Sequence, residues 1–171
     1  MEGESILQAM AEIAVAFAGF TGVVAAFGHG GAVPWSAGDR LRFQTMLGTS
    51  LAALLFALLP FVFYHIGFRG ERLWVYSSSF MGVYLSGAAI FYLHLFRSGR
   101  ASPPAVDRPS PVVGAIVFLL TIGTIGAQFL NALGMGFHRE FGAYLLGVAI
   151  LLLLSSVMFV RLLSFVRRVV D

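Results

Sequence analysis

The chain has 171 residues, of which 58% are hydrophobic and only 11% are charged. Soluble domains carry about a quarter charged residues, so a membrane environment is the simplest explanation of this composition. The absence of cysteine excludes disulfides and thiol catalysis, and the absence of lysine excludes Schiff-base chemistry. The net charge of +3 comes from arginines scattered singly between apolar runs, a pattern that argues against nucleic-acid binding and indicates topology signals instead.

Five apolar runs reach the length of about 20 residues that crosses the hydrocarbon core of a bilayer. They predict an all-α integral membrane protein, a bundle of five transmembrane helices that forms a single domain over residues 1–171. Four spans remain if the first run lies on the membrane surface. The first residues, MEGES, include no basic residue, so we expect the first run to be retained rather than cleaved as a signal peptide. The predicted spans are 5–28, 43–66, 74–96, 112–134 and 141–165.

The arginines predict an orientation, because cytoplasmic loops are enriched in basic residues. The side that includes the polar, proline-rich loop 97–111 carries eight arginines and the other side three. We therefore expect a multi-pass protein of the cell membrane with its N-terminus outside and its C-terminus in the cytoplasm. Trp35 and Trp74 are predicted to be interfacial anchors on opposite sides. The cytoplasmic set is Arg40, Arg42, Arg97, Arg100, Arg108, Arg161, Arg167 and Arg168, and the outer set is Arg69, Arg72 and Arg139.

The first span contains a carboxylate, Glu12, where a charge costs about 2.5 to 3.5 kcal/mol at the centre of a membrane helix. Helical spacing sorts this span into three stripes, which indicates packing within protein, with Glu12 facing a cavity or an interface and not lipid. One stripe is bulky (Ile6, Met10, Ile13, Phe17, Phe20, Val24, Phe27), and one is small (Ala11, Ala14, Ala18, Thr21, Ala25, Gly28). The third is polar, then small: Ser5, Gln8, Glu12, Val15, Gly19, Gly22 and Ala26.

The third and fourth spans also carry polar or small residues at helical spacing. Glu12 is predicted to lie in the outer half of the membrane, about 7 Å from the midplane at about 1.5 Å per residue. Gln128 and Asn131 are predicted to lie in the same half. Gln8, Glu12, Gln128 and Asn131 are thus candidates for one polar cluster, provided that spans one and four are neighbours. Gly82 and Ser86 are predicted to form a helix-packing interface, which is the commonest role of such residues in membrane helices.

Catalytic and metal sites have little support in the sequence. We find no nucleophile elbow, phosphate loop or zinc motif, and only one deep carboxylate, so we expect no enzyme, no catalytic residue and no metal. Two histidines on neighbouring spans can hold a haem iron, but all four histidines fall near span ends. The possible pairs are His29 with His94 and His65 with His138. A haem-binding redox subunit is therefore the third hypothesis, and no cofactor is expected.

The leading hypothesis is an oligomeric, channel-like protein that conducts cations or protons along a path lined by the first helix. In a symmetric oligomer, Glu12 forms a carboxylate ring, Val15 an apolar constriction, and Gly19 with Gly22 a wider passage; such rings select cations and gate by dewetting. The expected partners are membrane lipid, further copies of the chain and an inorganic cation. The alternative is a non-conducting scaffold or partner subunit, in which loop 97–111 or the C-terminal RRVVD contacts protein or anionic lipid.

Overall fold

The computed structural model describes residues 3–30, 37–97 and 111–170, and these residues form helices and two short connections, 67–70 and 134–140, with no strand among them. The prediction of an all-α protein with five helices is confirmed. Each helix contains a stretch long and apolar enough to cross a membrane. Trp35 and residues 98–110 of the predicted polar loop lie outside the described residues. The helices are α1 (Glu4–Gly30), α2 (Ala37–Ile66), α3 (Glu71–Arg97), α4 (Pro111–Leu133) and α5 (Phe141–Val170).

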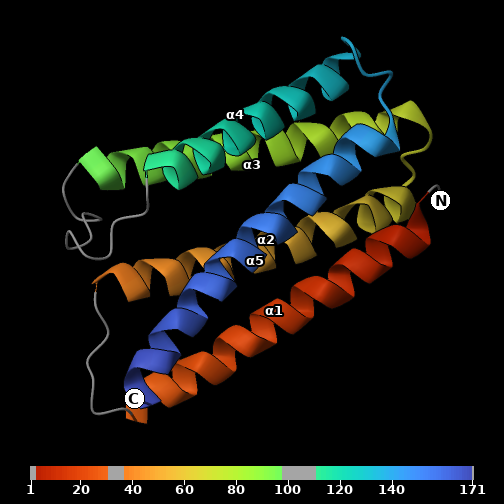
Figure 1. Ribbon diagram of the computed structural model, residues 1–171. Helices are drawn as coiled ribbons and strands as arrows, with labels where there is room; N and C mark the ends of the chain where they lie inside the picture. The colour runs from red at the N-terminus through yellow and green to blue at the C-terminus, as the bar shows by residue number, and fades with distance from the viewer. Residues whose placement is uncertain (1–2, 31–36, 98–110, 171) are drawn as a thin grey trace.

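Successive helices run in opposite directions, so both ends of the bundle collect alternate connections (Figure 1). The helix α5 is central, because it packs against all four other helices and crosses α2 diagonally (Figure 1). The helix α1 packs on α2 and α5, and α3 pairs with α4 on the opposite side of the bundle. No extended interface joins α1 to α4 within the described part of the chain.

Small side chains set the contact between α1 and α2. Ala11 and Ala14 of α1 are buried, as are Ala53 and Ala57 of α2, and all four belong to the main apolar core. Small residues let helix backbones approach closely, which gains dispersion contacts where lipid supplies no hydrophobic drive. The small stripe predicted from the sequence is therefore the packing face of α1. Because buried residues run from Leu7 to Val24, α1 is part of the bundle over most of its length.

The helices α2 and α4 end in the same way, at the same end of the bundle. Gly67 and Gly134 have φ angles of 115° and 72°, a backbone conformation that side chains with a Cβ disfavour. A backbone hydrogen bond closes each end. At the end of α2 the amide of Phe68 donates to the carbonyl of Phe63, and at the end of α4 the amide of Met135 donates to the carbonyl of Leu130. This is the Schellman arrangement, in which a left-handed glycine lets the chain turn back and satisfies helix-end carbonyls.

Pro60 lies inside α2 and is fully buried. Because proline has no amide hydrogen, it cannot donate to the carbonyl of Phe56 one turn earlier. The hydroxyl of Tyr144 on α5 donates to that carbonyl instead, at 2.5 Å. A side chain from the central helix thus satisfies the backbone acceptor that the proline leaves open, as a dry interior requires.

Trp74 is not the interfacial anchor that the sequence predicted. Its side chain is only 5% exposed, and its ring lies 5.3 Å from that of Phe141 and 5.7 Å from that of Tyr144, between ring centroids. Position near a span end predicts an anchor only where the side chain faces outward. Here the helix face that carries Trp74 is turned toward α5, so the indole belongs to the core.

Candidate functional site

The polar and small stripe of α1 lies on the outside of the single chain. All its predicted functional members are exposed, so no other described segment of the same chain covers them. A methyl group added at either glycine of the stripe would meet nothing within 4 Å. The stripe follows directly beside the buried alanine face because α1 has 3.6 residues per turn. These exposed residues are Gln8, Glu12, Val15, Gly19 and Gly22.

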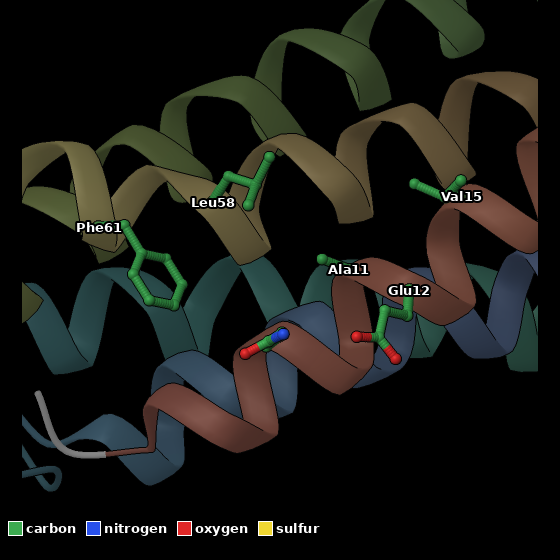
Figure 2. Close-up of a pocket in the computed structure, with 6 residues that line it drawn as sticks. Ala11, Glu12, Val15, Leu58 and Phe61 are labelled. Carbon is green, nitrogen blue, oxygen red and sulfur yellow. The ribbon is translucent and has the colours of Figure 1, made fainter.

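Glu12 borders an open groove between α1 and α2. Leu58 and Phe61 of α2 form the opposite wall, and Figure 2 shows Phe61 reaching from α2 toward α1. The groove has a volume of about 530 Å³ and an almost wholly apolar lining, in which Gln8 and Glu12 are the only polar side chains. Within the described part of the chain, the Glu12 carboxylate has no hydrogen bond or ion pair. The carboxylate is therefore available to a group from outside the chain.

The structure does not bring Gln128 and Asn131 to Glu12. Both amides are fully buried between α3, α4 and the start of α5, whereas Glu12 and Gln8 are exposed on α1. The predicted cluster of four polar residues required spans one and four to be neighbours, and the central position of α5 separates them. The candidates thus form two separate groups.

Asn131 joins three segments of the chain. Its Nδ2 donates to Ser78 Oγ of α3 at 2.9 Å and to the carbonyl of Glu140 at 3.1 Å. Its Oδ1 accepts the Glu140 amide at 2.9 Å. An ion pair of 2.9 Å between Arg139 and Glu71 lies beside these bonds and also ties the α4–α5 connection to α3. Asn131 therefore fixes where α5 begins.

Gln128 and Gly147 occupy a tightly packed contact between α4 and α5. Gln128 Nε2 donates to the carbonyl of Ala143 at 2.9 Å, while its Oε1 is buried with no protein partner in the described residues. A methyl group on Gly147 would collide with Met81 Sδ and Gln128 Nε2. The backbone of α5 approaches its neighbours here only because position 147 has no side chain.

The predicted packing residues of α3 lie toward α4. Gly82 is buried, and a methyl group placed on it would come 3.2 Å from the ring of Phe129 on α4. Ser86 is half-buried, and its hydroxyl donates back to the carbonyl of Gly82 at 2.7 Å, within α3. The hydroxyl proton is thus used within its own helix.

Other polar side chains connect α2 to α5 toward the opposite end of the bundle. The hydroxyls of Ser50 and Ser155 lie 2.6 Å apart and both are buried. Ser50 donates its single hydroxyl proton to the carbonyl of Met46 at 2.8 Å, so Ser155, whose Oγ lies 3.3 Å from the same carbonyl, is the donor in the contact between the two hydroxyls. These serines are packing residues that hold two helices together, and they leave no hydroxyl free for chemistry.

The histidines form no metal site in the described part of the chain, where no group of three His, Cys, Asp or Glu side chains converges. His65 Nδ1 lies 2.8 Å from the carbonyl of Phe61 in its own helix. His138 lies 3.7 Å from the Glu140 carboxylate in the α4–α5 connection. The side chain of His29 is not among those that the structure describes.

Sequence reasoning missed the α2 side of the groove. Leu58 and Phe61 are ordinary apolar residues in an apolar span, so nothing in their type distinguishes them from lipid-facing neighbours. Pro60, which lies between them in the sequence, was a usable signal, since proline removes a backbone donor from the helix interior. Tyr144 was missed as well, and its role follows only from the contact with Phe56.

The chain matches no protein-family model, no curated protein and no solved structure.

Proposed function

We propose that the protein is an oligomeric membrane protein that conducts cations or protons along a path lined by α1. The observation that carries the proposal is Glu12, a carboxylate in the apolar span of α1 that is exposed and has no partner among the described residues. Intramembrane carboxylates almost always face a bundle interior or a water-filled cavity. A second copy of the chain, or water held between copies, supplies that environment.

The order of residues along α1 supports a path at an oligomer axis. Glu12 gives a ring of carboxylates, which selects cations, and Val15 gives an apolar ring one turn further on. Gly19 and Gly22 follow with open space beside them, which gives a wider passage. These four residues lie on one exposed side of α1, so several copies can present them to a common axis without repacking the fold.

The proposed orientation places the start of α1 outside and the end of α5 in the cytoplasm of a cell. The support is the arginine bias between the two sides, which sets orientation in short-loop membrane proteins. In this orientation Glu12 lies in the outer half of the path, and a cation entering from outside meets the carboxylate ring before the Val15 constriction.

Ion flux in liposomes tests the proposal. Wild-type protein should dissipate a proton or potassium gradient, and Glu12→Gln should lose most of that flux, because the amide keeps the shape and removes the charge. Glu140→Gln, which changes an exposed carboxylate outside the spans, should conduct like the wild type. Flux that is unchanged in Glu12→Gln contradicts the proposal, and a monomer in mild detergent with no flux favours the non-conducting scaffold.

The absence of native cysteine gives a second test. A cysteine placed at Gly19 or Gly22 should make flux sensitive to a charged, membrane-impermeant thiol reagent, because both positions line the proposed path. A cysteine at Ile13, an exposed residue of the bulky stripe, should leave flux insensitive. Equal sensitivity at all three positions would place the path elsewhere.

A further inference from the structure

We infer that the groove between α1 and α2 binds a lipophilic organic cation, with its charge against Glu12 and its apolar body against Leu58 and Phe61. This inference concerns a single chain and goes beyond the proposed function, since it does not require the chain to conduct. The observations that carry it are the groove itself, the unpartnered carboxylate at its edge and the apolar character of its walls.

Charge complementarity selects a cation. The Glu12 carboxylate is a negative charge at the edge of an apolar groove, and the attraction between opposite charges grows as the effective dielectric constant falls from that of water. A bound cation makes the site neutral overall, which removes the penalty for a net charge within the membrane. The Gln8 carboxamide lies in the same groove and adds a dipole beside the charge.

The walls select an organic cation over a metal ion. Within the described residues no three ligating side chains meet, so a small inorganic cation would lose its water shell in exchange for one carboxylate and one amide. A cation whose charge is spread over a large apolar body loses less hydration and gains contact with Leu58 and Phe61. The volume of about 530 Å³ falls in the range of about 300–1,000 Å³ that is usual for small-molecule sites.

Phe61 adds an aromatic ring to the groove, and Figure 2 shows this side chain extending from α2 toward α1. Aromatic rings attract cations placed over their faces, by about 0.5–1 kcal/mol at exposed sites. The ring and the carboxylate line the same groove from different helices, so a cation with a large apolar body can contact both walls. The groove is open at its side, which gives a ligand a route from outside the chain.

Equilibrium binding of tetraphenylphosphonium to the full chain in phosphatidylcholine nanodiscs tests the inference. We expect saturable binding with one cation per chain. Glu12→Gln should weaken it about tenfold or more, equivalent to about 1.4 kcal/mol. Phe61→Leu should weaken it about two- to fivefold, the size of an exposed cation–π contact. Tetraphenylborate, an anion of the same shape, should show no saturable binding.

The matched control is Glu4→Gln, which removes a carboxylate from the same helix outside the groove and should bind the cation like the wild type. Glu12→Asp, which keeps the charge, should retain more affinity than Glu12→Gln. Unchanged binding in Glu12→Gln, or equal binding of tetraphenylborate, overturns the inference. If Glu12→Gln abolishes ion flux but leaves binding unchanged, the inference falls and the proposed function stands. If binding depends on Glu12 but the protein shows no ion flux, the inference stands and the proposed function falls.

Discussion

Two pairs of polar residues in this bundle differ in how the chain treats them. Asn131 and Gln128 are fully buried, and the Asn131 amide and the Nε2 group of Gln128 bond to α3 and to the backbone around the start of α5, while Gln128 Oε1 has no partner among the described residues. Gln8 and Glu12 are exposed on α1 beside an open groove and have no hydrogen-bond partner in the described residues. All four had the same signature in the sequence, a polar residue within an apolar span.

The difference shows how polar residues in membrane helices divide between structure and function. A polar group that the chain itself satisfies is part of the packing, and its removal costs stability. A polar group that the chain leaves unsatisfied costs free energy on insertion and returns none to the fold, so a role outside the single chain explains it better. Mutations that compare the two pairs therefore test this division.

The largest difference in stability is expected between Asn131→Ala and Gln8→Ala. Loss of Asn131 leaves the Ser78 hydroxyl and both backbone groups of Glu140 without this partner, at about 1–3 kcal/mol for a buried group left unsatisfied. We expect unfolding to become easier by about 3 kcal/mol in total. Gln8→Ala should stay within about 0.5 kcal/mol of the wild type, as exposed substitutions do. Equilibrium unfolding in detergent micelles measures both, and equal losses would contradict the division.

Glycines of the two regions should respond to alanine with opposite signs. Gly147→Ala forces a methyl group against Met81 and Gln128, and overpacking of this kind costs about 1–3 kcal/mol. Gly19→Ala meets open space, so the better helix propensity of alanine should stabilise the chain by about 0.5–1 kcal/mol. Thermal unfolding of the two variants gives the comparison. A loss of stability in Gly19→Ala would show that α1 is closely covered, as at an interface between copies.

The fold was predictable from sequence to the extent that it depends on composition. Spans such as Phe141–Arg161 are long and apolar enough to cross a membrane, and small residues such as Ala11 and Ala14 mark a packing face by their spacing alone. Which helix occupies the centre was not predictable, because every span is apolar around much of its circumference. Trp74 shows the limit: its position near a span end indicates an anchor, but the direction it faces depends on where α5 lies.

The candidate site was predictable only in its α1 half. The order of Gln8, Glu12 and Val15 along one face follows from helical spacing, so these residues were found without a structure. Their relation to Gln128 and Asn131 depended on helix adjacency, which periodicity does not encode, and that prediction was wrong. The second wall, Leu58 and Phe61, has no chemical signature, so only the packing of α2 against α1 reveals it.

A coupling between Tyr144 and Pro60 is the sharpest test of how the chain satisfies its own polar groups. Tyr144→Phe removes the donor to the Phe56 carbonyl and should cost about 1–2 kcal/mol, since it leaves a buried acceptor unpaired. Pro60→Ala restores an amide that can bond to the same carbonyl within α2. Tyr144→Phe should therefore destabilise the Pro60→Ala variant less than the wild type. A double-mutant cycle of unfolding free energies should give a coupling of about 1 kcal/mol between the two positions. Additive effects would mean that Tyr144 stabilises the bundle through its ring alone and that the carbonyl freed by Pro60 does not need it.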